Sequence, residues 1–294
     1  MSGSFLHGRT FRGFLQCWGP GHNGKTGWTE TLRHVVGTKS EGYGKLLPTR
    51  VLIENKNDGG DRPNGGLTSI MGKRAVFMDE PTKGRRVDDG KIKEITGGTA
   101  NSERRLNQND AVEWTPQLTL CISTNAKLRI DDKSDGMWDR VRFIPFENRI
   151  PEDKKEDQIW LRLFEEEGEG ILAQMVDAAQ TYIKTGEPPI PQKITEAVEE
   201  YRREEDILGQ FLEENVRRVE GAELPHGRLM DRYNDWVADN NYGRGMSTSK
   251  MSKELVDQKG WVKGRNNRFR YWEDFELIPR APEISKWPGA SQAS

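Results

Sequence analysis

The sequence is poor in cysteine and histidine, and it has no long apolar run. Two cysteines in 294 residues cannot build a disulfide framework, and the four scattered histidines do not have the spacing of zinc ligands. No stretch approaches the ~18 consecutive apolar residues of a membrane span, and residues 1–13 lack the apolar core of a signal peptide. We therefore expect a soluble, intracellular protein that does not contact a membrane.

A large net charge is also absent. The 45 basic and 47 acidic residues give a net charge of −2, which excludes a uniformly basic nucleic-acid coat. The charges are nevertheless unevenly distributed, because residues 1–150 carry 24 basic and 18 acidic side chains while residues 151–220 carry 9 and 19. Residues 244–272 hold eight basic and two acidic side chains, so we expect a basic surface near the C-terminus.

Large apolar side chains are present in numbers that support a folded core. The 9 Trp and 10 Phe residues exclude global disorder. Short apolar runs that end at turn-forming or acidic residues predict strands at 14–18, 74–78, 117–123 and 141–146. Helical or loop sequence separates these runs, beginning with a predicted helix over 24–37. This alternation predicts the α/β class with a parallel sheet, in which ligands bind beyond the strand ends.

The pattern becomes helical after residue 151. Apolar side chains at helical spacing predict one helix over 170–183 and a second over 193–219. The acid-rich outer face of the second helix is most simply a solvated surface.

A glycine-rich loop follows the first predicted strand and has the spacing G-x-x-x-x-G-K-T. Such a loop lets backbone N–H groups surround a polyphosphate, while its lysine reaches the β- and γ-phosphates and its hydroxyl binds Mg²⁺. A chance glycine turn is the alternative, but the strand before the loop and the helix after it are the context that a phosphate-binding loop requires. The predicted nucleotide-binding residues are Gly19, Pro20, Gly21, His22, Asn23, Gly24, Lys25 and Thr26.

Three further signals lie beside predicted strands. Asp79 can hold Mg²⁺, and Glu80 can activate an attacking water. Asn125 can hydrogen-bond that water or the γ-phosphate, and Arg140 can face the γ-phosphate of a neighbouring subunit. Each residue taken alone has an ordinary explanation as a helix cap, a turn or a surface ion pair. The functional interpretation of these four residues depends on the phosphate-binding loop.

The order of these motifs resembles the superfamily 3 helicases of the AAA+ class. The motifs read GPGHNGKT, AVFMDEP, ITGG, LTLCISTN and DGMWDRVRFIPF, and they are most similar to the C-terminal helicase part of phage, plasmid and poxvirus primase-helicases. The resemblance covers about residues 13–220. It implies ring hexamers that hydrolyse ATP with Mg²⁺ at subunit interfaces and draw one DNA strand through the centre. It also implies that Lys25 and Thr26 are the Walker A pair and that Asp79 and Glu80 are the Walker B acids. Asn125 is then the sensor 1 residue, and Arg140 and Arg142 are the first and the second candidate for the arginine finger.

The sequence departs from the family's pattern in two places. Gly27 follows Thr26 where a better helix former is usual. The chain also begins 18 residues before Gly19, without a preceding primase domain. We therefore expect a stand-alone motor or one part of a split system whose primase or polymerase is a separate chain.

Two regions are candidates for DNA contacts. Residues 102–116 predict a hairpin that, by the resemblance, points into the central channel. Residues 221–281 predict a winged helix with helices over 224–240 and 248–259 and two short strands at 261–263 and 268–272. A solvated charged loop and a winged helix that contacts protein are the alternatives. The candidates are Lys91, Lys93, Arg104 and Arg105 for a single strand, and Lys250, Lys253, Lys263, Arg265, Arg268 and Arg270 for a duplex.

These features predict four parts of the chain. They are a superfamily 3 P-loop ATPase domain over 1–150, a helical segment over 151–220, a winged-helix domain over 221–281 and a flexible tail over 282–294. The predicted function is an ATP-driven DNA helicase motor for replication of a viral, plasmid or mobile element, in the host cytoplasm or nucleoid if viral. An ATP-switched origin-binding initiator or loader is the alternative, and a P-loop kinase or transferase is a weaker one.

Overall fold

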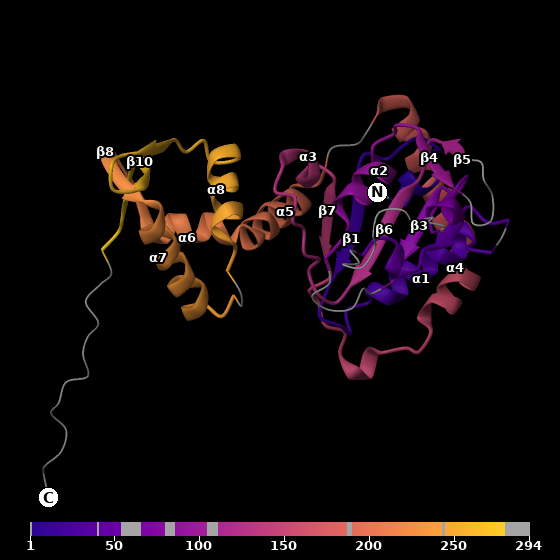
Figure 1. Ribbon diagram of the computed structural model, residues 1–294. Helices are drawn as coiled ribbons and strands as arrows, with labels where there is room; N and C mark the ends of the chain where they lie inside the picture. The colour runs from indigo at the N-terminus through magenta and orange to yellow at the C-terminus, as the bar shows by residue number, and fades with distance from the viewer. Residues whose placement is uncertain are drawn as a thin grey trace, which may run out of the picture. The chain divides into compact units, whose positions relative to one another are not determined.

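The chain folds into two compact units, residues 1–205 and 206–294, each with its own core (Figure 1). The structure is a computed structural model. The structure describes the backbone of residues 2–39, 41–53, 66–79, 86–104, 111–186, 190–242 and 245–279, and the side chains of all of these except 101–104 and 111.

A five-stranded, fully parallel sheet forms the centre of the first unit, with the strand order β2-β3-β6-β1-β7. Four of the strands match the strands that the sequence predicts, and the α/β class with a parallel sheet is confirmed. Their apolar residues are buried on both faces, as in other parallel sheets that are covered by helices. The strands are β1 (Phe14–Trp18), β2 (Gly44–Leu46), β3 (Ala75–Met78), β6 (Thr119–Thr124) and β7 (Val141–Pro145).

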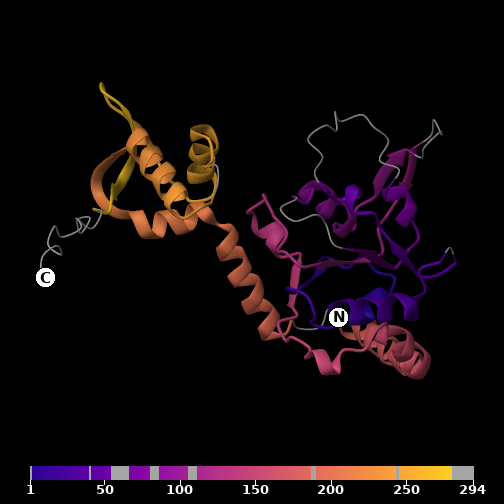
Figure 2. The same ribbon diagram turned by 90° about the horizontal axis from the view of Figure 1, so that it is seen from below.

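Helices cover both faces of this sheet. One face packs on α1, α4 and η1, and the other packs on α2, α3 and α5 together with the loop after β2 (Figures 1 and 2). The sequence predicts a hairpin over 102–116, and the structure has the antiparallel hairpin β4–β5 (Asn101–Arg104 and Ala111–Trp114) there, on the α2 side of the sheet. The helices are η1 (Ser2–Phe5), α1 (Lys25–Val36), η2 (Thr49–Val51), η3 (Leu67–Ile70), α2 (Asp89–Thr96), α3 (Asp135–Trp138), η4 (Glu152–Lys154), α4 (Ile159–Thr185) and α5 (Gln192–Glu205).

The positions of the two cysteines reflect the order of the strands in the sheet. Cys17 of β1 and Cys121 of β6 are buried, and their Sγ atoms lie 3.8 Å apart. The hydrogen bond with the Cys17 thiol, together with burial, raises the pKa of Cys121 well above its ordinary value. The strand that follows β1 in space is therefore β6, so the end of the phosphate-binding loop's strand lies beside Asn125.

The second unit packs three helices against a three-stranded antiparallel sheet with the order β8-β10-β9. Ser247 caps α8 as the sequence predicts, because its side chain accepts a hydrogen bond from the Lys250 N–H. The elements are α6 (Ile207–Asn215), β8 (Val216–Pro225), α7 (His226–Asp239), α8 (Thr248–Asp257), β9 (Lys263–Arg265) and β10 (Arg270–Leu277).

Two of the predicted helices differ from those observed. The helix predicted at 170–183 is the last part of the longer α4, whose first turns lie on α1. The single helix predicted over 193–219 is wrong, because the chain breaks at Asp206 and becomes extended from Val216. The boundary between the two units falls at this break, and β8 runs across residue 220. The four functional parts of the chain stay predictions.

Candidate active site

The loop between β1 and α1 is held in the shape of a phosphate cradle. Gly21 and Gly24 have φ angles of 106° and 79°, a region that glycine enters without strain. Asn23 fixes the loop, because its Nδ2 donates to the Phe146 carbonyl over 2.7 Å and its Oδ1 accepts from the Lys25 N–H over 3.3 Å. Gly19 leaves room for Asn23, since a Cβ atom there would lie 1.9 Å from Asn23 Nδ2.

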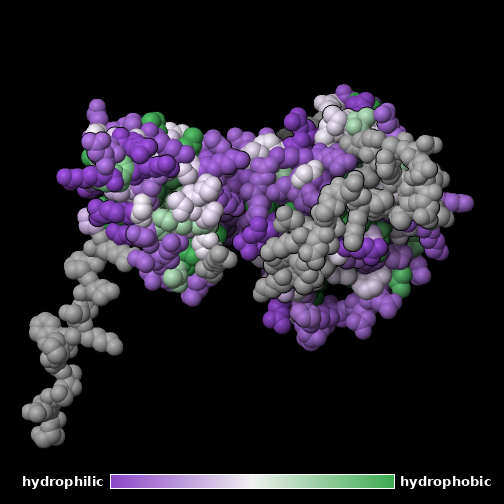
Figure 3. Space-filling view, in the orientation of Figure 1, coloured by the Kyte–Doolittle hydropathy of each residue, from purple (hydrophilic) through white to green (hydrophobic). Residues whose placement is uncertain are grey.

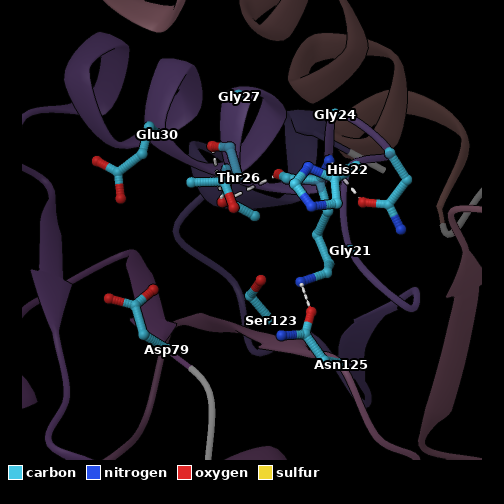
Figure 4. A pocket seen from close by; sticks show the side chains of 12 residues that line it. Gly21, His22, Gly24, Thr26, Gly27, Glu30, Asp79, Ser123 and Asn125 are labelled. Atoms are coloured by element: carbon cyan, nitrogen blue, oxygen red, sulfur yellow. Dashed lines mark hydrogen bonds between the residues drawn. The ribbon is translucent and has the colours of Figure 1, made fainter. Parts of the chain in front are cut away.

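A cavity of about 550 Å³ opens at the N-terminus of α1, and residues from the separate sequence motifs line it together (Figure 4). The loop forms one wall, Asp79 lies beyond the end of β3, and Asn125 lies beyond the end of β6. We call this space the phosphate cavity. Its lining residues are Gly21, His22, Asn23, Gly24, Lys25, Thr26, Gly27, Thr29, Glu30, Asp79, Ser123 and Asn125.

Lys25 is the central cation of the phosphate cavity. Its side chain is only 6% exposed, and its Nζ donates to Asn125 Oδ1 over 2.8 Å (Figure 4). Burying an ammonium is costly unless a hydrogen-bond acceptor meets it, and Asn125 supplies one without adding a negative charge. Lys25 therefore places a positive charge beside the loop where a phosphate group would bind.

The acidic side of the phosphate cavity contains a charge network that the sequence analysis missed. Arg33 of α1 pairs with Glu30, and its Nη1 lies 3.3 Å from Asp79 Oδ2. Figure 4 shows Glu30 and Asp79 on the same side of the cavity, opposite Asn125. The i, i+3 spacing of Glu30 and Arg33 on the helix after the loop is the signal that could have found them.

The side chains of Arg140 and Arg142, the two candidates for the arginine finger, form hydrogen bonds within their own chain. Arg140 is 9% exposed, and it donates from Nε to Thr96 Oγ1 over 3.1 Å and from Nη1 to the Gly136 carbonyl. Arg142 is 7% exposed and donates to the Asp139 carbonyl over 2.6 Å. Neither arginine lines the phosphate cavity of its own chain.

The candidate DNA-binding residues fall into two groups. In the second unit all six predicted basic residues, from Lys250 to Arg270, are exposed, and the surface over β8 and β10 is mostly hydrophilic (Figure 3). In the first unit Lys91 and Lys93 are half-buried and pair with Asp88 and Asp132.

Three predicted site residues have no side-chain description. Glu80 and Arg105 lie outside the described residues, and for Arg104 the structure gives the backbone alone. In the described part of the chain, no group of three or more His, Cys, Asp or Glu side chains has the arrangement of a metal centre. None of the helices described is both long and apolar enough to cross a lipid bilayer.

The chain is similar in sequence to several viral proteins. No protein-family model matches it. It is 26% identical over 259 residues to "Putative helicase 121R" of Invertebrate iridescent virus 3, and 25% identical over 255 residues to "Putative helicase 022R" of Frog virus 3. It is also 23% identical over 276 residues to a "Putative primase" of African swine fever virus. These alignments cover 79%, 81% and 85% of the chain, but only 27%, 26% and 28% of the relatives.

Among solved structures, the C-terminal region of NrS-1 in an apo form gives a TM-score of 0.49 at 12% identity, over 92% of this chain and 69% of that one. The chain is a homologue of large DNA virus proteins that are named "Putative helicase" and "Putative primase", and the resemblance to superfamily 3 helicases is confirmed as far as these names reach. It spans about a quarter of the length of these relatives.

Proposed function

We propose that the chain is an ATP-driven, Mg²⁺-dependent DNA helicase motor for replication of a viral, plasmid or mobile element. The observation that carries the proposal is the meeting of the phosphate-binding loop, Asp79 and Asn125 around one cavity. The parallel sheet brings the ends of β1, β3 and β6 to one edge, and polar residues 54 and 100 positions after Lys25 line the same cavity there, as in sites that bind a ligand at the strand ends. The names of the viral relatives support a helicase role.

The phosphate groups of ATP would bind between the loop and Lys25. Lys25, whose Nζ donates to Asn125, would then contact the β- and γ-phosphates, and the Asn125 amide would face an attacking water. Thr26 and Asp79 are both exposed to the phosphate cavity and offer a hydroxyl and a carboxylate, the oxygen ligands that Mg²⁺ prefers. The residues present therefore fit Mg²⁺, and the bound ion would neutralise charge on the phosphates.

Hydrolysis would need a base beside the γ-phosphate. We assign this role to Glu80, which follows Asp79 directly in the sequence. Arg33 would hold the Asp79 carboxylate in place, because its guanidinium bridges Glu30 and Asp79. Asp79 and Glu80 thus divide two tasks, metal binding and activation of water.

We further propose a homo-hexamer in which Arg140 acts on the nucleotide of the next subunit, with Arg142 as the second candidate. The bonds from Nε and Nη1 to Thr96 and Gly136 fix the plane of the Arg140 guanidinium. Within the residues that the structure describes, Nη2 of Arg140 has no hydrogen bond to the protein. An anchored guanidinium with one nitrogen to spare suits recognition of a phosphate oxygen.

For the second unit we propose a winged helix that binds duplex DNA. Helices α7 and α8 followed by the β9–β10 hairpin have the order of such a domain, and exposed basic residues lie on α8 and on the hairpin. Asn266 shapes the hairpin turn, because its Oδ1 accepts from the N–H groups of Arg268 and Phe269 over 3.0 and 2.9 Å. In the first unit the hairpin β4–β5 stays the candidate for single-strand contacts.

Two variants of the full chain test the motor. Lys25→Ala should abolish ATP hydrolysis and weaken nucleotide binding, whereas Glu80→Gln should keep binding and lose turnover by about 10²-fold or more, because it removes only the base. ATP hydrolysis that single-stranded DNA stimulates, together with unwinding of a forked duplex, supports the proposal. Origin-DNA binding without unwinding would favour an initiator or loader, and turnover indifferent to DNA would favour a kinase or transferase. Normal turnover in Glu80→Gln would refute the role of that residue.

A further inference from the structure

The segment that carries Asn125 is fixed on both sides of this residue along the chain. Before and at Asn125, the contacts come from the phosphate-binding loop. The Thr124 carbonyl accepts a hydrogen bond from the Gly19 N–H over 3.2 Å, and Asn125 Oδ1 accepts one from Lys25 Nζ over 2.8 Å. After Asn125, residues 127–128 contact α5, the helix that lies beside β7 (Figure 1). The position of the Asn125 amide therefore depends on a helix that is distant in the sequence.

Lys127 is the side chain that joins this segment to α5. Its Nζ lies 2.5 Å from Glu204 Oε2. Three aromatic rings also surround the ammonium, whose distances to the ring centres of Trp18, Phe143 and Tyr201 are 5.2, 5.5 and 5.7 Å. The side chain is only 24% exposed, so water screens its attraction to the rings and to the carboxylate only in part. Because the rings belong to β1, β7 and α5, one ammonium interacts with three elements.

Tyr201 of α5 fixes the backbone that follows Lys127. Its side chain is fully buried, and its hydroxyl donates to the Leu128 carbonyl. Its ring centre lies 4.9 Å from that of Phe143, and its ring meets Trp138 edge-on with the centres 5.3 Å apart. These contacts leave the Tyr201 ring little freedom to move, so it is a rigid support for this part of the backbone.

We propose that Lys127 is a positioning residue that holds the Asn125 amide where an attacking water would meet it. The inference rests on the proposed function, because it needs Asn125 to act in ATP hydrolysis. Lys127 does not line the phosphate cavity and is separated from Asn125 by one residue, so it acts on the reaction only through the backbone. Lys25 would contact the phosphates of a bound nucleotide, whereas the contacts of Lys127 with α5 are an anchor that the nucleotide does not touch.

Variants of Lys127 in the full chain test the assignment. Lys127→Met keeps an unbranched apolar side chain against the rings and removes the ammonium. Since a misplacement of about 1 Å can cost about 10²-fold in rate, we expect kcat for ATP hydrolysis to fall about tenfold. The Kd of a non-hydrolysable ATP analogue should stay within about twofold, because Lys127 does not contact the nucleotide. Lys127→Arg keeps a cation over the rings and beside Glu204, so it should restore most of kcat.

Glu204→Gln tests the same anchor at a more exposed position, where the change does not threaten the fold. Its side chain is 49% exposed, and the substitution removes only the charge that pairs with Lys127. We expect kcat to fall about threefold, less than in Lys127→Met, because the aromatic rings still hold the ammonium. The melting temperature of each variant is measured with kcat, so that a loss of folded protein is not mistaken for a loss of turnover.

Lys133→Met is the matched control. Lys133 also pairs with a glutamate of α5, Glu205, at 3.6 Å, and it also lies over an aromatic ring, that of Trp138, at 6.0 Å. It lies eight residues after Asn125, so its replacement should leave kcat and Kd unchanged.

Three results would overturn the inference. Lys127→Met could lower kcat no more than Lys133→Met does, it could lower kcat and the affinity for the analogue equally, or Lys127→Arg could fail to restore kcat. In each case Lys127 does not position Asn125. If the wild-type chain does not hydrolyse ATP, the proposed function itself fails, which is a distinct result.

Discussion

At the scale of single residues, the site is built from side chains that already form a hydrogen bond or an ion pair with a neighbouring residue before a ligand binds. Asn23 ties the loop to the end of β7, Asn125 meets Lys25, and Arg33 meets Asp79. Preorganised partners lower the cost of ordering the site when a ligand binds. The residues that the motifs highlight therefore depend on residues, such as Asn23 and Arg33, whose second roles only the structure shows.

Asp89 at the start of α2 gives a pH-dependent contribution to stability. Burial, together with the negative charges of Asp132 and Asp131, raises its pKa to about 6, although the Asp132 N–H donates to its Oδ2 over 2.7 Å. Because the pKa is higher in the folded than in the unfolded chain, the folded state is favoured while Asp89 can stay protonated. This contribution is largest below about pH 4 and is lost as the pH rises through about 6.

Asp89→Asn should therefore raise the free energy of unfolding at pH 8 relative to the wild type, and this advantage should shrink as the pH falls to 4. The asparagine Oδ1 can still accept from the Asp132 N–H, so the change mainly removes the charge. Urea unfolding at pH 4, 6 and 8 measures the effect. Asp177→Asn, an exposed change on α4, should not alter the pH dependence. An equal difference at all three pH values would contradict the assignment.

At the scale of elements, local signals predicted the half of the first unit that carries the site. Strand β1, the loop and α1 follow from a short apolar run, two glycines and a lysine, all within 25 residues of sequence. The first half of α4 could not be read in the same way, because a run of acidic residues, Glu165, Glu166 and Glu167, follows its apolar side chains, and packing against α1 stabilises the helix.

Long-range pairing explains the remaining errors. The segment from Val216 has the charge pattern of a helix, but it pairs with β10, more than 40 residues later in the chain. Strand β2 is only three residues long and is defined by its partner β3. Trp28 of α1 and Trp160 of α4 likewise line one cavity, and no spacing in the sequence indicates that they come together.

Asp206 marks the break between α5 and α6 and caps the second of these helices. Its Oδ1 accepts from the Gly209 N–H over 2.9 Å, and its Oδ2 lies 2.8 Å from Lys259 Nζ. Asp206→Ala should lose about 1 kcal/mol of local stability, so amides of α6 should exchange about fivefold faster in hydrogen exchange.

Asp206→Asn separates the cap from the ion pair. It keeps an oxygen that can accept from Gly209 and loses only the partly exposed pair with Lys259, so its effect should be smaller. Equal exchange rates in the wild type and both variants would mean that α6 does not depend on this cap.

The β9–β10 hairpin should contribute to DNA binding through its charges. If Arg265, Arg268 and Arg270 each neutralise one phosphate, replacing all three by alanine should reduce the slope of log affinity against log salt by ~3 for duplex DNA. Titrations at several salt concentrations measure that slope. Arg217→Ala is the control, because Arg217 already pairs with Glu276. An unchanged slope in the triple variant would remove the hairpin from the proposed interface.

At the scale of the whole molecule, the acidic and basic stretches of the sequence fall on different elements of the structure. The acidic stretch of the sequence falls mainly on α4, α5 and α6, whereas exposed basic residues lie on α8 and the β9–β10 hairpin of the second unit. A near-zero net charge therefore does not argue against binding nucleic acid, because binding depends on the local field of one surface.

Assembly is the property on which the proposed motor finally depends, and Arg140 provides its test. If Arg140 acts on the nucleotide of a neighbouring subunit, Arg140→Ala should bind ATP nearly normally and hydrolyse it ~10³-fold more slowly. Its melting temperature must be measured as well, because the variant also loses the bonds to Thr96 and Gly136.

Mixing two inactive variants then separates action between subunits from action within one. Arg140→Ala and Lys25→Ala are each defective, but an interface that combines Lys25 from the first chain with Arg140 from the second contains every required group. Some ATP hydrolysis should therefore return in mixed oligomers, and Arg142→Ala should be milder if Arg142 only braces β7 through the Asp139 carbonyl. If mixed oligomers form and no activity returns, Arg140 is not a finger that acts between subunits. If the wild-type chain hydrolyses ATP at full rate as a monomer, the ring itself is unnecessary and the buried bonds of Arg140 are its whole role.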